Sequence, residues 1–192
     1  LTMSYDEDII STESLIESNA AIDSDVGGEQ FKAEYTLSGS EPEGVLDFII
    51  NATDYMGNPG SYGSTTDGSQ VTYDKTPPQL INVNAASNNA DIAWAKVGDS
   101  IIISFTSNEE ILTPTVSILN QTSTVSNPQG NNYKAIYVPN ESDIEGEANF
   151  EIRFSDLASN EGTPINASTN NTKVIFDKTP PADFIVGLLT PT

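Results

Sequence analysis

The chain has 192 residues, with 28 acidic and seven basic side chains, a formal net charge of −21 at pH 7, and neither histidine nor cysteine. This charge excludes nucleic acids and anionic membrane surfaces as partners, because both require a basic face. The missing residue types exclude disulfides, Cys/His zinc sites and triads with a histidine base. No apolar run approaches the roughly 18 residues of a membrane-spanning helix, so no membrane insertion is expected.

The first element lies in the acidic stretch 6–18, DEDIISTESLIES, whose spacing would also suit a helix. Its internal equivalent, 108–119, carries Pro114 in the middle. Proline removes a backbone donor and breaks a helix interior. A loop followed by a strand is therefore predicted for both segments.

Alternating apolar and polar residues dominate the later segments. In 100–107, SIIISFTS, the side chains of Ile101, Ile103 and Phe105 share one face. This period of two is typical of half-buried strands in antiparallel sheets. Seven short strands without helices predict an all-β fold made of tandem immunoglobulin-like, seven-strand Greek-key β-sandwiches. The strands expected in one complete repeat are 79–84, 97–107, 113–119, 122–126, 132–138, 147–155 and 172–177.

The chain repeats itself at a shift of 102 residues (133 minus 31). Segment 31–35, FKAEY, falls on 133–137, YKAIY, and 43–50, EGVLDFII, falls on 145–152, EGEANFEI. Self-similarity at a fixed period is the signature of a tandem array.

Three domains follow from this repeat. Residues 1–76 are expected to form an Ig-like repeat that lacks its first strand, and 77–180 a complete repeat. Residues 181–192 either begin a following repeat or act as a donor strand. The first reading makes the chain a window from a longer array. The second makes it a subunit of a self-assembling filament, joined head to tail by strand addition to an open sandwich edge.

The phrase DKTPP occurs twice, at 74–78 and 177–181, where the shift has become 103 (177 minus 74). Proline fixes φ and pushes the preceding residue toward extended geometry. Two successive prolines therefore predict a short, stiff joint between repeats.

A D-x-x-G-N motif runs from Asp54 to Asn58, and Asp156 opens its counterpart in the second repeat. An Asp side chain can close a turn by accepting hydrogen bonds from amides two residues on, and Gly57 would supply a positive φ. One interpretation is that both aspartates only shape a turn.

Calcium binding is the alternative, and both interpretations stay open. In a seven-strand sandwich the loops around 107–110 and 156–162 and the incoming linker meet at one end. Ca²⁺ takes six to eight oxygen ligands of the kinds found there. Glu41 and Glu43, from the loop 40–44 of the preceding repeat, would lie nearby. The candidate metal ligands are Asp74, Asn108, Glu109, Glu110, Asp156 and Asn160.

No enzyme is expected. Adjacent carboxylates such as Glu109 and Glu110 are unavoidable among so many acids and do not by themselves make a glycosidase. No G-x-S-x-G nucleophile motif is present. Trp94 has no equivalent in the first repeat. It either packs in the core or the joint, or stacks on a carbohydrate.

The order of motifs from VGDSIIISFTSNEEILTPTVSI through EGEANFEIRFSDLASNEG to VIFDKTPP resembles the bacterial Ig-like tandem repeats of large cell-surface adhesins, including gliding adhesins. The resemblance covers the whole chain, and it departs from the pattern at Ser159, where glycine is expected. It implies an extracellular, cell-surface, non-enzymatic spacer or adhesive array.

Its partners would be neighbouring repeats, copies of itself, surface glycans, or host and abiotic surfaces. A filament or surface-layer subunit is the first alternative function, and a carbohydrate-binding module is the second.

Overall fold

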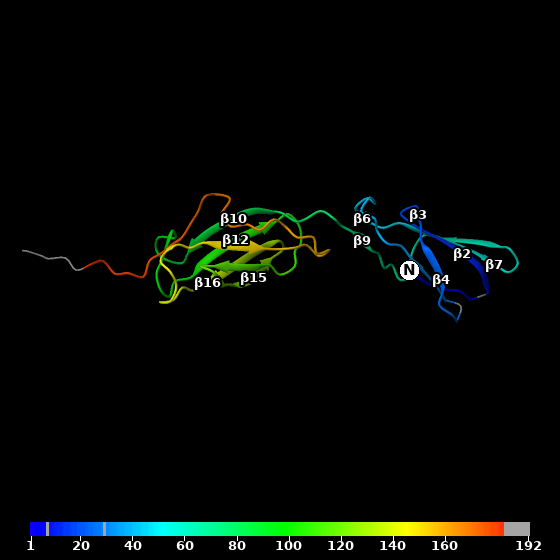
Figure 1. Ribbon diagram of the computed structural model, residues 1–192, viewed down its shortest axis with the longest axis horizontal. Coiled ribbons are helices and arrows are strands. Elements are labelled where there is room, and N and C mark those ends of the chain that lie inside the picture. Colours follow the sequence, from blue (N-terminus) through cyan, green and yellow to red (C-terminus); the bar gives the residue numbers. More distant parts are fainter. Residues whose placement is uncertain (7, 29, 183–192) are drawn as a thin grey trace, which may run out of the picture. The chain divides into compact units, whose positions relative to one another are not determined.

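The computed structural model describes residues 1–6, 8–28 and 30–182, and every regular element in those ranges is a β-strand (Figure 1). Contacts divide the chain into two compact units, Leu1–Lys75 and Thr76–Thr192, called unit 1 and unit 2 below. In the described ranges no helix is long and apolar enough to cross a membrane. Of the predicted terminal segment 181–192, residues 183–192 lie outside the described residues.

Unit 2 contains a four-stranded antiparallel sheet in the order β10–β12–β16–β15. A second sheet has the order β14–β13–β18, and a third has the order β11–β19–β17 with β11 and β19 parallel. The bounds are β10 Leu80–Ser87, β11 Trp94–Ala95, β12 Ile101–Ser107, β13 Thr115–Ile118, β14 Gln121–Thr122, β15 Thr124–Gln129, β16 Asn132–Tyr137, β17 Gly146–Glu147, β18 Phe150–Arg153 and β19 Ile175–Phe176.

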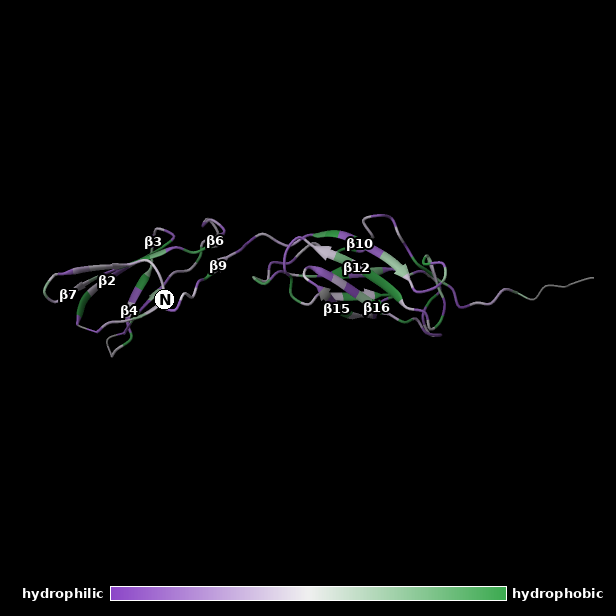
Figure 2. Ribbon diagram, turned by 180° about the vertical axis from the view of Figure 1, so that it is seen from behind, coloured by the Kyte–Doolittle hydropathy of each residue, from purple (hydrophilic) through white to green (hydrophobic). Residues whose placement is uncertain are grey.

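The core of unit 2 draws alternate residues from all three sheets. Burial along β12 alternates strictly, with Ile101, Ile103 and Phe105 buried and their neighbours half-buried. The same cluster includes Ile118 of β13 and Ile152 of β18. Hydrophobic and hydrophilic residues accordingly stand side by side along the strands (Figure 2). One core shared by several antiparallel sheets is consistent with a β-sandwich.

Unit 1 repeats the strand order of unit 2 without counterparts of β10 and β11, and with one additional strand, β8, beside β7. Its sheets have the orders β1–β5–β4, β3–β2–β7–β8 and β6–β9. The bounds are β1 Thr2–Ser4, β2 Ile9–Ile16, β3 Asn19–Ala20, β4 Ile22–Asp25, β5 Gln30–Glu34, β6 Gly44–Val45, β7 Phe48–Asp54, β8 Pro59–Tyr62 and β9 Thr72–Tyr73.

The strand registers of the two units coincide at the sequence shift. Met3 pairs with Phe31 across β1 and β5, as Phe105 pairs with Tyr133 across β12 and β16. Gly44 likewise pairs with Tyr73, at the positions that Gly146 and Phe176 hold in unit 2. Since a slip of one residue would reverse the buried and exposed faces, this agreement shows that the repeat is structural.

Several boundaries differ from the predicted strands. The second predicted strand, 97–107, begins only at Ile101, because a turn with Gly98 at φ 86° precedes it. The Asp99 carboxylate accepts the Lys96 N–H at 2.9 Å and closes this turn. The predicted strand 147–155 is divided between β17 and β18. The loop-then-strand prediction for 6–18 agrees with β2, which starts at Ile9.

Candidate metal centre

Both aspartates of the repeated motif shape turns. In unit 2, Asp156 follows β18, and its Oδ1 and Oδ2 accept hydrogen bonds from the backbone N and the Nδ2 of Asn160, each at 2.8 Å. In unit 1, Asp54 at the end of β7 accepts the same two bonds from Asn58 at 2.8 and 2.7 Å. The side-chain bond from Asn58, followed by its backbone bond, lowers the pKa of Asp54 below its usual value.

The backbone of the turn is left-handed at the same position in both units. Gly57 has φ 84°, and Ser159, its equivalent, has φ 72°. A residue with a Cβ is strained in this region, whereas glycine is not. The turn geometry is therefore kept in unit 2 despite the unfavourable residue.

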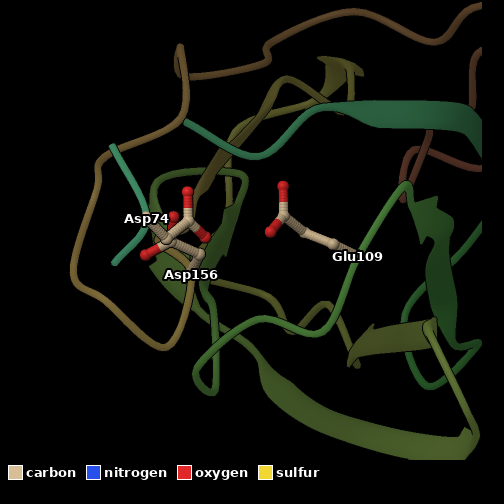
Figure 3. Close-up of side chains that lie close together, drawn as sticks. All are labelled: Asp74, Glu109 and Asp156. Atoms are coloured by element: carbon tan, nitrogen blue, oxygen red, sulfur yellow. The ribbon is translucent and has the colours of Figure 1, made fainter. Parts of the chain in front are cut away.

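Three carboxylates of the predicted ligand set come together. One oxygen each of Asp74, Glu109 and Asp156 lies within 4.8 Å of the others. Figure 3 shows the carboxylates of Asp74 and Asp156 close together, with the Glu109 side chain extending toward them. Asp156 is only 1% exposed, and the other two are half-buried.

Each of the three comes from a different segment. Asp74 directly follows β9 and is the first residue of the DKTPP phrase at 74–78, called the connector below. It lies two residues before unit 2 begins at Thr76. Glu109 follows β12, and the buried Ser107 hydroxyl donates a hydrogen bond to the Glu109 carbonyl oxygen. Asp156 is held by the turn that Asn160 closes. Local hydrogen bonds thus hold the Asp156 carboxylate and the backbone at Glu109.

The other three predicted ligands have different surroundings. The Asn108 side-chain oxygen accepts the Gln79 N–H at 2.7 Å, while the Asn108 N–H bonds to the Gln79 carbonyl at 3.0 Å. Asn160 directs its amide hydrogens to Asp156. Glu110 is exposed and lies outside the cluster among the described residues. Of the six predicted ligands, Asp74, Glu109 and Asp156 form the cluster of carboxylates, and the other three do not join it.

Glu41 and Glu43, expected near the joint, are engaged within unit 1. Glu41 is 3% exposed and accepts the Tyr35 hydroxyl at 2.5 Å and the Ser38 N–H at 3.0 Å. The Tyr35 hydrogen bond, with the backbone bond from Ser38, lowers the Glu41 pKa to about 2. Glu43 accepts the Lys75 N–H at 2.8 Å.

A lysine clamp, which sequence reasoning missed, holds the repeated DKTPP phrase. Lys75 Nζ donates to the carbonyl oxygens of Gly39 at 3.0 Å and Glu41 at 3.1 Å. Lys178 Nζ donates to those of Glu141 at 2.7 Å and Asp143 at 2.8 Å. The lysine of the phrase thus ties the end of each unit to its own loop.

The loop that receives each clamp is built around an acid and a tyrosine. Tyr137 OH donates to Asp143 Oδ2 at 2.8 Å, at the positions of Tyr35 and Glu41 in unit 1. Burial, followed by this hydrogen bond, raises the pKa of Tyr137. A signal was present in the sequence, because tyrosine, acid and lysine recur together at the repeat spacing.

The donor set would suit an oxygen-preferring cation such as Ca²⁺ better than zinc. Ca²⁺ prefers carboxylate and carbonyl oxygens at about 2.3–2.6 Å, so two oxygens on one ion lie within about 5 Å of each other. The three carboxylates meet this limit. Zinc sites prefer Cys and His, which the chain lacks. Asp74, Glu109 and Asp156 are therefore the residues that would hold the ion.

Trp94, which was expected either to pack in the core or the joint or to stack on a carbohydrate, is exposed. It lies in β11 and its side chain is 47% exposed. Among the described residues the ring pairs are Tyr5 with Phe31 and Phe105 with Tyr133, and neither includes Trp94.

No family model and no curated protein matches this chain.

Proposed function

We propose that the chain is a portion of an extracellular bacterial surface protein, in which tandem Ig-like Greek-key sandwiches form a non-enzymatic spacer for cell adhesion. The observation that carries this proposal is the coincidence of strand registers between the two units at the repeat shift. Its direct partners are then neighbouring repeats. A separate adhesive part, which the spacer holds away from the cell, would bind glycans, host surfaces or abiotic surfaces.

A spacer requires stiff joints between its domains. Hydrogen bonds and burial on both sides of the connector restrict its motion. On one side, Lys75 is tied to unit 1 through its N–H and its Nζ. On the other side, Pro78 is buried in unit 2, and Gln79 exchanges two hydrogen bonds with Asn108. Only Thr76 and the φ-restricted Pro77 separate these anchors.

Calcium is the second part of the proposal. An ion held by Asp74, Glu109 and Asp156 would tie the connector to two loops of unit 2 and neutralise their mutual repulsion. A site of this kind binds Ca²⁺ more tightly as more charged ligands surround the ion. The joint would then be stiff at extracellular calcium concentrations and looser without the ion.

The stiffness is tested by single-pair energy transfer between dyes on Glu13→Cys and Gln121→Cys, both exposed positions in a chain without native cysteine. We expect a narrow distribution of transfer efficiency. Inserting Gly-Ser-Gly-Ser between Thr76 and Pro77 should broaden it. If the parent chain is as broad as the insertion variant, the spacer proposal is wrong.

The calcium part is tested separately by titration calorimetry. Glu109→Gln should weaken Ca²⁺ binding by roughly tenfold or more, because it removes one charged ligand. Glu110→Gln, which changes the exposed neighbouring acid, is the matched control and should leave the affinity unchanged. Equal effects of the two substitutions would refute this site.

A further inference from the structure

Trp94 stands on the outer face of the small sheet β11–β19–β17 in unit 2. Successive side chains of a strand point to opposite faces, and the next residues of β11 and β19, Ala95 and Phe176, are buried in the core. The Trp94 ring therefore points away from the core. Its backbone is fixed, because the N–H donates to the Asp91 carbonyl at 3.0 Å and the carbonyl accepts the Ser87 hydroxyl. An exposed indole on a fixed backbone is thus available to a ligand.

The strand registers continue this outer face toward a pair of opposite charges. Trp94 pairs with Ile175 across β11 and β19, and Ile175 pairs with Glu147 across β19 and β17. Neighbouring strands lie about 4.8 Å apart, so the row of three residues spans about 10 Å. At its far end the Lys173 ammonium lies 3.4 Å from the Glu147 carboxylate. The row therefore runs from an aromatic ring to an ion pair without net charge.

A cavity of about 300 Å³ lies beside this ion pair. Its volume is at the lower end of the range for small-ligand sites, about 300–1,000 Å³. The buried part of its lining is apolar and includes Ala148 and Phe150. The exposed polar groups that line it are Glu147, Lys173, Asn149, Asn166 and Asn171. Within the described ranges, the three asparagine side chains make no hydrogen bond, so their donors and acceptors are free for a ligand.

The fold does not require the amide of Asn171. Unit 1 builds the corresponding loop with the same closing hydrogen bond, which runs from the Thr65 hydroxyl to the Ser69 carbonyl at 2.8 Å and measures 2.6 Å in unit 2. Where unit 2 has Asn171, with φ 59°, unit 1 has Gly68, with φ 73°. Glycine serves this left-handed position at least as well, so the backbone conformation does not explain the amide.

We infer that the row from Trp94 to Glu147 and the adjoining cavity bind a neutral oligosaccharide of hexopyranose units. An indole offers a large apolar face to the C–H face of a sugar ring. An amide carries two donors and an acceptor, which match hydroxyl groups that both donate and accept. The net charge of −21 opposes a polyanionic glycan. This activity belongs to unit 2 alone and is additional to the spacer function, which depends on the connector.

The complete chain is tested by titration with cellotetraose, laminaritetraose, maltotetraose, mannotetraose and galactotetraose, with tetragalacturonate as the charged comparison. Trp94 is the only tryptophan, so its emission reports on the site directly. We expect a saturable blue shift with at least one neutral tetrasaccharide, because stacking removes water from the indole. No saturable shift with any of the five, or tightest binding of tetragalacturonate, overturns the inference.

The aromatic contact is then tested by calorimetry with the tetrasaccharide that binds most tightly. Trp94→Ala should weaken binding tenfold or more, because the stacking surface is lost. Tyr55→Ala is the matched control, since it removes an exposed ring of unit 1, and it should leave the affinity unchanged. Thermal unfolding verifies that both variants are folded. Equal affinity of Trp94→Ala and the parent chain would overturn the proposed surface.

The amide contact has its own pair of variants. Asn171→Gly keeps the left-handed backbone and removes the side chain, so binding should weaken roughly three- to tenfold. Asn120→Gly is the matched control, because Asn120 is exposed at φ 63° in the turn between β13 and β14, outside the cavity lining. It should bind as the parent chain does. Binding that survives Asn171→Gly unchanged, or falls equally in both variants, would overturn the assignment of the cavity.

Discussion

Lys178 Nζ lies 2.8 Å from the carbonyl oxygen of Asp143, a residue 35 positions earlier in the chain. The same ammonium group also bonds the Glu141 carbonyl at 2.7 Å, and the Lys178 N–H bonds Glu145 at 2.7 Å. Three hydrogen bonds from one residue therefore fasten the last segment of unit 2 to the loop between β16 and β17. This fastening keeps β19 in place at the end of the unit.

Replacing the clamp lysine should destabilise unit 2. Lys178→Met keeps the aliphatic stem but leaves two carbonyls without their donor, so we expect the free energy of unfolding to fall by about 1–3 kcal/mol. Urea denaturation, followed by the fluorescence of Trp94 in unit 2, measures the change. The control is Lys173→Met, which removes an exposed ion pair to Glu147 and should cost less than about 0.5 kcal/mol. Equal costs would show that the clamp contributes nothing specific.

The buried acid of unit 1 should make this unit sensitive to acid. Glu41 has a folded pKa of about 2, below its ordinary 4.5, because Tyr35 and the Ser38 amide donate to its carboxylate. A depressed folded pKa stabilises the folded state above the unfolded pKa, and the contribution disappears as the pH falls through the folded value. Unit 1 should therefore lose stability steadily between pH 4.5 and pH 2.

Glu41→Gln separates this effect from general acid unfolding. The variant should be less stable than the parent at pH 7, and the difference should shrink as the pH approaches 2. Hydrogen exchange of the β5 amides, measured against pH, follows unit 1 alone. A difference between parent and variant that is constant over this range would contradict the assigned pKa.

The alternation of side chains predicted most strands of unit 2, and the loop–strand prediction for β2 was confirmed at Ile9. Alternation is a strong signal where one face is buried. The short strand β11 was missed, because a parallel pair of two residues has too little length for a period. Its Trp94 and Ala95 are positioned by backbone bonds to β19 rather than by a pattern.

The candidate site was predicted as a set of loops but not as a set of contacts. Nothing in the spacing distinguishes Glu109, which enters the cluster, from Glu110, which is exposed. Asn108 was predicted as a ligand, yet its side chain pairs with the backbone of Gln79. The clamp was missed for a related reason, since the acceptors of Lys178 are main-chain carbonyls, which every residue carries.

Glycine at position 162 should be required by packing rather than by backbone conformation. A Cβ built there would lie 2.2 Å from the ring of Phe154, which is buried. Gly162→Ala should therefore destabilise unit 2 by about 1–3 kcal/mol through overpacking. Gly60→Ala, at the equivalent position of unit 1, meets only the exposed Tyr62 ring at 3.2 Å and should be tolerated. Thermal unfolding of both variants tests this contrast, and comparable losses would contradict it.

The turn after β18 should improve when its strained residue is relieved. Ser159 has φ 72°, in a region where a Cβ costs about 1–2 kcal/mol and glycine pays no such penalty. Ser159→Gly should therefore raise the unfolding free energy of unit 2 by roughly 1 kcal/mol, after the greater chain entropy of glycine is subtracted. Gly57→Ala makes the reverse change in unit 1, at φ 84°, and should lower its stability by a similar amount. Because the same turn also positions Asp156, calorimetry of Ser159→Gly should show an unchanged Ca²⁺ affinity, since the two bonds from Asn160 remain. A loss of stability in Ser159→Gly would mean that the serine makes a contact that outweighs the strain.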